Sequence, residues 1–202
     1  MRPGPLYRRL RFGRPIVVVS GLPRSGTSMM MRMLEKGGMP ILSDGVRTAD
    51  ESNPRGYYEF TPVKGLDKSP DVGWLAGARG RAVKVVSSLL EHLPARHNYR
   101  VIFMRRDLDE VIASQNAMLA RRGEPVTASA DLRHVLETHV GRVLGLVARR
   151  PGFALIEVSY ADALHHPAEQ AARVAAFVGR PLDTAKMASA VEEPLYRNRR
   201  QA

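Results

Sequence analysis

The sequence predicts an α/β fold of three layers, in which a mostly parallel sheet of four or five strands carries helices on both faces. Short apolar runs rich in β-branched residues alternate with longer segments of helical period, the pattern of parallel strands joined by helical crossovers. Glycine or proline marks the ends of the helical segments. Because 202 residues is the length of one ordinary domain, we expect residues 1–202 to form a single domain.

The predicted strands are apolar runs that begin and end near turn residues. In order they cover residues 16–20, 82–86, 100–104 and 153–158, with a weaker candidate at 40–42. The predicted helices have apolar residues at helical spacing and a terminal Gly or Pro. They cover residues 26–36, 108–122, 130–150 and 168–178.

Two further segments lack such periodicity. Residues 1–14 contain five arginines, so we expect a basic N-terminal extension. Residues 45–80 are rich in proline and glycine, which predicts long loops with short helices. Because a long irregular stretch in a compact domain is often functional, we expect these loops on the substrate side.

The composition excludes several classes of function. The chain has no cysteine, so disulfides, thiol redox chemistry and Cys-ligated zinc are excluded. Its formal net charge of +11 attracts anions, but the arginines are scattered without interleaved aromatics, so we expect no nucleic-acid partner. No apolar stretch approaches the ~20 residues that a membrane span needs, and we expect a cytoplasmic protein.

The clearest candidate site is the loop at residues 21–28, which follows the first strand and opens the first long helix. In this context backbone N–H groups and the helix dipole converge on one point and favour an anion. An ordinary glycine-containing turn is the alternative. The residues that we expect to bind the anion are Arg24, Ser25, Gly26, Thr27 and Ser28.

The spacing of Gly21 and Gly26 matches the phosphate loop of P-loop nucleotide triphosphatases, but Thr27 stands where those proteins carry lysine. The missing lysine argues against ATP or GTP hydrolysis. The run from Pro23 to Ser28 instead resembles the 5′-phosphosulfate loop of sulfotransferases that use 3′-phosphoadenosine 5′-phosphosulfate (PAPS). This resemblance implies a P-loop-like fold, with Arg24 and the loop hydroxyls around the phosphosulfate.

A second motif follows the strand at 100–104. Arg106 ends the strand, Asp107 is a candidate helix N-cap, and Ser114 comes eight residues after Arg106. Ligands of open α/β sheets bind at this end of the strands. The types and spacing resemble the Arg and Ser that bind the 3′-phosphate of PAPS in sulfotransferases. The alternative is a local ion pair between Arg106 and Asp109.

A third motif, at residues 159–164, resembles the strand-to-helix region of sulfotransferases whose tyrosine approaches the adenine. The resemblance assigns that role to Tyr160. The basic C-terminal tail contains Arg197 and Arg199, which resemble a C-terminal loop that contacts the 3′-phosphate. A frayed terminus is the alternative for the tail.

The candidate catalytic residues are Lys84, Glu59 and Arg24. A lysine in an apolar strand is costly without an anion, which favours a site role for Lys84. The sulfotransferase strand at this place carries a histidine base where this chain has Val86. The segment at 53–59 resembles one that carries a glutamate base in bacterial members, which makes Glu59 the first candidate. Glu51 and His92 are the weaker candidates, and a surface pair with Arg55 is the alternative for Glu59.

The three motifs together predict a bacterial-type sulfotransferase that moves a sulfuryl group from PAPS to a hydroxyl or amine. The acceptor is a small molecule, lipid or glycan, no metal is required, and a homodimer is possible. One alternative is a small-molecule or nucleoside kinase on the same core. The other is a catalytically degenerate protein that binds an anion or nucleic acid.

Overall fold

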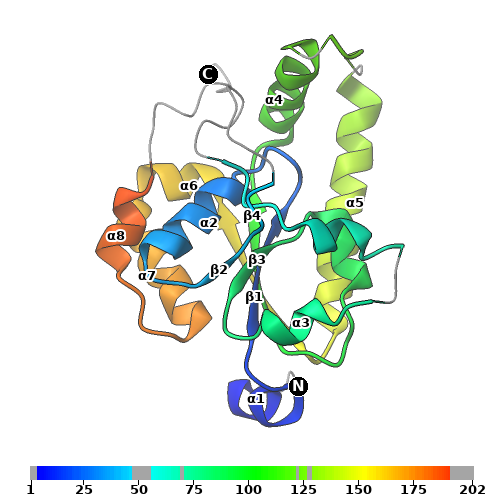
Figure 1. Ribbon diagram of the computed structural model, residues 1–202. Helices are drawn as coiled ribbons and strands as arrows, with labels where there is room; N and C mark the ends of the chain where they lie inside the picture. The colour runs from blue at the N-terminus through cyan, green and yellow to red at the C-terminus, as the bar shows by residue number, and fades with distance from the viewer. Residues whose placement is uncertain (1–3, 47–55, 69–70, 122, 127–128, 192–202) are drawn as a thin grey trace.

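The computed structural model describes residues 4–46, 56–68, 71–121, 123–126 and 129–191. Its sheet has five strands, all parallel, in the order β2-β3-β1-β4-β5. Helices cover both faces (Figure 1), which confirms the predicted α/β fold. The strands are β1 (Ile16–Gly21), β2 (Ile41–Leu42), β3 (Ala82–Lys84), β4 (Tyr99–Arg105) and β5 (Phe153–Ser159).

The central strand β1 pairs with β3 on one side and β4 on the other. Since all five strands are parallel, they end at one edge of the sheet and begin at the opposite one. We call these the carboxyl edge and the amino edge. The loops that follow β1, β3 and β4 therefore meet at the carboxyl edge, where ligands of such sheets bind.

The four predicted long helices are present, within a residue of their predicted bounds at most ends. They are α2 (Thr27–Lys36), α4 (Leu108–Arg121), α5 (Ser129–Arg149) and α7 (Pro167–Val178). The shorter helices are α1 (Pro5–Phe12), α3 (Trp74–Gly77), α6 (Tyr160–His165) and α8 (Thr184–Ser189), with 3-10 turns η1 (Thr61–Gly65) and η2 (Ser87–His92).

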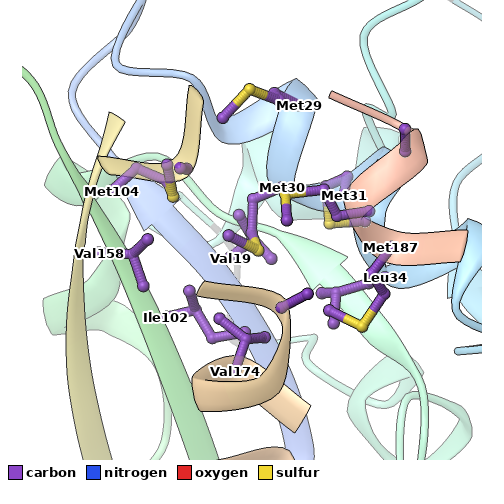
Figure 2. Close-up of a cluster of buried hydrophobic side chains, with 14 of the residues drawn as sticks. Val19, Met29, Met30, Met31, Leu34, Ile102, Met104, Val158, Val174 and Met187 are labelled. Carbon is purple, nitrogen blue, oxygen red and sulfur yellow. The ribbon is translucent and has the colours of Figure 1, made fainter. Parts of the chain in front are cut away.

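Two hydrophobic cores fill the faces of the sheet. The first lies under α2, α7 and α8, and the side chains of Met29, Met30, Met31 and Met33 are buried in it. Figure 2 shows several of these thioethers packed between β1 and α8. Burial makes these methionines part of the hydrophobic core. The second core packs α3, η2 and α5 against the other face.

The third strand and the N-terminal extension differ from the sequence prediction, and the short helices expected within residues 45–80 are present. The third strand ends at Lys84, two residues early, because Val86 leads directly into η2. Within residues 45–80, η1 and α3 bury Val63 and Leu75 in the second core, so the later part of this segment packs on the sheet. The basic N-terminal extension contains the helix α1, which has Pro5 in its first turn.

Candidate functional site

The loop between β1 and α2 turns sharply at three residues. Gly21 has φ +149°, and a Cβ there would lie 2.8 Å from the Met104 carbonyl oxygen. Gly26 has φ +96°, and a Cβ there would collide with the Tyr160 ring. Arg24 adopts a left-handed φ of 70°, which is uncommon for a residue with a side chain. Glycine is therefore required at both ends of the loop.

The start of α2 presents polar groups that suit an anion. Gly26 is the N-cap and supplies no capping side chain, and the first turn has no acidic residue. Thr27 and Ser28 are half-exposed in this turn. The Ser25 side chain is buried, and its hydroxyl has no hydrogen-bond partner among the described residues. A buried hydroxyl without a partner is costly, so a ligand that bonds Ser25 would relieve that cost.

Lys84 reaches this loop from the neighbouring strand. It lies opposite Val19 in the β1–β3 register, and its Nζ is 3.3 Å from Ser28 Oγ. The same Nζ donates to the Tyr57 carbonyl oxygen at 2.6 Å. Lys84 therefore places a half-buried positive charge at the start of α2, although Thr27 occupies the usual lysine position.

The second and third motifs converge on the same loop. Arg24 Nε donates to Ser114 Oγ at 3.0 Å, and Arg106 Nη1 donates to the Arg24 carbonyl oxygen at 3.1 Å. The Arg106 guanidinium carbon lies 4.7 Å from the centroid of the Tyr160 ring. Burial is the largest cause of the raised pKa of Tyr160, so its phenol is neutral. The structure thus brings Arg24, Arg106, Ser114 and Tyr160 together.

Arg106 forms a buried ion pair that the sequence analysis did not predict. Its Nε lies 2.9 Å from Glu110 Oε2, and both side chains are only 8% exposed. The alternative of an Arg106–Asp109 pair is wrong, because Asp109 pairs with Arg133 at 2.6 Å. The i, i+4 spacing of Arg106 and Glu110 was the available signal.

The prediction that Asp107 caps α4 is confirmed. Its carboxylate accepts hydrogen bonds from the backbone N–H groups of Asp109 and Glu110, at 2.9 and 3.3 Å. This cap fixes the start of α4 directly after β4, between Arg106 at the end of the strand and Ser114 within the helix.

Glu59 lies in the segment that Lys84 contacts. Its carboxylate forms an ion pair with Lys64 at 2.8 Å and is 18% exposed. The proposed surface partner Arg55 lies outside the described residues, as do Glu51, Arg197 and Arg199. No role of Glu59 follows from the ion pair alone.

The neighbouring Tyr58 holds this segment against α2. Its backbone has a left-handed φ of 52°, and its hydroxyl donates to Glu35 Oε2 at 2.6 Å. Burial, and then the hydrogen bond to Glu35, raises the pKa of Tyr58, so the phenol stays protonated as the donor. Together with the Lys84–Tyr57 bond, this contact holds the segment beside α2.

A cavity of about 210 Å³ opens beside the loop, between α4 and α5. Ser25 and Arg106 line it together with Glu137, and the rest of its wall is mainly apolar. Within the described ranges, no group of His, Asp or Glu side chains is arranged to hold a metal ion. None of the helices described there is both long and apolar enough to cross a bilayer.

No family model matches the chain, and neither does any curated protein sequence. Three solved structures are similar over most of it. A sulfotransferase from Alicyclobacillus acidocaldarius covers 90% of this chain and 88% of its own, at 15% identity and a TM-score of 0.50. The sulfotransferase domain of the curacin biosynthetic pathway covers 89% and 78%, at 15% identity and a TM-score of 0.52.

The third structure is the sulfotransferase STF9 from Mycobacterium avium. It covers 88% of this chain and 66% of its own, at 16% identity and a TM-score of 0.56. At these identities the similarity shows the fold, and the chain therefore has the α/β fold of the sulfotransferases.

Proposed function

We propose that this chain is a sulfotransferase that moves a sulfuryl group from PAPS to a hydroxyl or amine of a small-molecule acceptor. The observation that carries the proposal is the meeting of Lys84 with Ser28 at the start of α2. A phosphate loop that lacks its usual lysine receives the charge from β3 instead.

The residues present fit the phosphosulfate end of PAPS. The open first turn of α2 offers N–H donors, and the buried Ser25 hydroxyl lacks a partner among the described residues. When bound, PAPS supplies an activated sulfuryl group on its 5′-phosphate. Lys84 then neutralises the charge that grows on the leaving phosphate as the S–O bond breaks. Positioning and charge stabilisation are the main demands of such a transfer.

The 3′-phosphate belongs, in this proposal, beside Arg106 and Ser114, and Arg24 belongs with the phosphosulfate. The hydrogen bond from Arg24 to Ser114 links the second motif to the phosphate loop. One connected group of residues would therefore bind both the 5′-phosphosulfate and the 3′-phosphate. The Tyr160 ring packs against Gly26, and the Arg106 guanidinium lies over this ring. Its part in the adenine site rests on the resemblance.

Calorimetry with 3′-phosphoadenosine 5′-phosphate tests the donor site directly. We expect binding at sub-millimolar concentration, and the absence of binding would refute the proposal. A parallel assay uses ATP with Mg²⁺. Consumption of ATP in the presence of small metabolites would support the kinase alternative instead. Incubation with PAPS and a metabolite extract, followed by mass spectrometry for an added sulfo group, then identifies the acceptor.

Glu59 is the proposed base that takes the proton from the acceptor. We expect Glu59→Gln to lower turnover at least tenfold while 3′-phosphoadenosine 5′-phosphate still binds. Glu124→Gln, at an exposed position, is the matched control and should leave turnover unchanged. Full turnover in the Glu59 variant would remove the residue from this role.

A further inference from the structure

A second and larger cavity opens at the amino edge, on the side of the sheet away from the phosphate loop. Its volume is about 420 Å³, and it lies between α1, the starts of β1 and β4, and the turn after α7. Four arginines line it: Arg9, Arg14, Arg100 and Arg180. The described residues that line it include no Asp or Glu.

Two glycines make room for two of these guanidinium groups. Gly80 has φ +76°, and a Cβ there would lie 2.8 Å from Arg14 Nη2. Gly179 has φ +62°, and a Cβ there would collide with Arg100 Nη1. The left-handed φ favours glycine at both positions, and the guanidinium groups lie close against this backbone. The arginines are therefore packed into the wall of the cavity.

Two of the four arginines donate hydrogen bonds to backbone carbonyl oxygens. Arg100 donates to the Phe177 carbonyl oxygen, and Arg180 Nη1 donates to the Gly80 carbonyl oxygen at 3.3 Å. In the described part of the chain, none of the four lining arginines has a carboxylate partner. Burial, and then repulsion from Arg8, lowers the pKa of Arg100. An unneutralised cluster of like charges opposes folding.

We propose that this cavity binds a phosphate monoester whose remaining part is apolar or planar. Guanidinium groups bind phosphate through paired N–H donors, and four of them surround this space. Apart from Asn98, the other side chains of the wall are apolar and include Val17, Met39 and Val178. The volume falls in the usual range for small-molecule sites.

The site is separate from the proposed donor site. Val17 lies at the start of β1 and Gly21 at its end, so the whole length of the strand separates the cavity from the phosphate loop. A regulatory or carrier ligand can therefore bind without competing with the donor. The phosphate can come from a soluble metabolite or from the headgroup of phosphatidic acid, and the test distinguishes these sources.

The test is calorimetric titration of the full chain with phenyl phosphate, a phosphate monoester on a planar apolar body. We expect sub-millimolar binding that persists in Lys84→Met and in the presence of saturating 3′-phosphoadenosine 5′-phosphate. Binding should weaken at least tenfold in the double variant Arg14→Gln/Arg180→Gln. The control is Arg149→Gln, which removes the charge of an exposed arginine of α5 that lines neither cavity and should bind as the wild type does.

Three results would overturn the proposal. They are no binding of either phenyl phosphate or vesicles that contain phosphatidic acid, loss of phenyl phosphate binding in Lys84→Met, and weakening in Arg149→Gln equal to that in the double variant. The same variants are assayed with vesicles that contain phosphatidic acid. Binding of vesicles that depends on Arg14 and Arg180, without binding of phenyl phosphate, assigns the phosphate to a lipid headgroup. Binding of phenyl phosphate assigns it to a soluble ligand. Far-UV circular dichroism and the melting temperature confirm that each variant is folded.

Discussion

The two edges of the sheet are both rich in cations but hold them differently. At the carboxyl edge, Arg106 has a carboxylate partner in Glu110, and Arg24 bonds the Ser114 hydroxyl. At the amino edge, the partners of Arg100 and Arg180 are backbone carbonyls. Side-chain partners fix a cation in one geometry and partly neutralise it, whereas carbonyl partners leave its full charge.

The difference indicates different kinds of recognition. A group-transfer site needs donors held in one orientation, which the bonds among Arg24, Arg106 and Ser114 provide. A cavity that only binds an anion needs charge more than orientation, and the four arginines of the amino edge provide it. The two edges should therefore respond in opposite ways when a charge is removed.

The largest expected effect is on the buried ion pair. Glu110→Gln leaves the Arg106 charge buried without its carboxylate and should lower the free energy of unfolding by about 3 kcal/mol. Asp109→Asn breaks the half-exposed pair with Arg133 in the same helical turn, and should cost less than about 1 kcal/mol. Urea denaturation measures both. Equal costs would mean that the Arg106 pair is not a structural part of the carboxyl edge.

The next largest effect is on donor affinity. Lys84→Met removes the charge beside Ser28 while keeping a side chain of similar length, so the affinity for 3′-phosphoadenosine 5′-phosphate should fall at least tenfold, or about 1.4 kcal/mol. Lys186→Met, at an exposed position of α8, should not change it. Calorimetry gives both dissociation constants. Unchanged affinity in the Lys84 variant would separate Lys84 from the donor site.

A smaller effect concerns pH and the amino edge. Burial, followed by repulsion from Arg79 and Arg96, lowers the pKa of His97 below its ordinary 6.5. The unfolded chain then binds a proton more readily than the folded one, so stability is complete above about pH 6.5 and falls as the pH drops toward the folded pKa. Urea denaturation between pH 7 and pH 5 should show this loss. His97→Phe should reduce the slope, and an unchanged slope would assign it to other groups.

The smallest effect is expected for an arginine of the amino edge. Arg14→Gln removes one charge from a like-charged cluster, so the free energy of unfolding should stay constant or rise, within about 0.5 kcal/mol. Any rise should disappear at high salt, because screening weakens the repulsion. A loss above 1 kcal/mol in low salt would show that Arg14 stabilises the fold and would erase the contrast between the two edges.

Much of the fold was predictable because β1, β4 and β5 are runs of branched apolar residues and the long helices end at glycine or proline. The order of the strands was not, since the chain passes from β1 through β2 and β3 before returning beside β1. That return is what brings Lys84 to Ser28. The sequence gives the residue at each position. Which residues lie side by side on neighbouring strands depends on the order of the strands in the sheet.

The site was partly predictable for the same reason. The motifs around Arg24, Arg106 and Tyr160 could be found by spacing, and the structure brings them together. Their roles toward a donor stay predictions. The helix α1 was not predicted, because arginines interrupt its apolar residues. The cavity at the amino edge, which α1 lines, was therefore not predicted either.

The methionines under α2 have a mechanical consequence. Met29, Met30, Met31 and Met33 are buried beneath the helix whose first turn belongs to the proposed donor site. A thioether chain is unbranched and can change its torsion angles to refill space, so a core of this kind adapts where branched side chains would resist. A shift of α2 would therefore meet less resistance from this core than from one built of branched side chains.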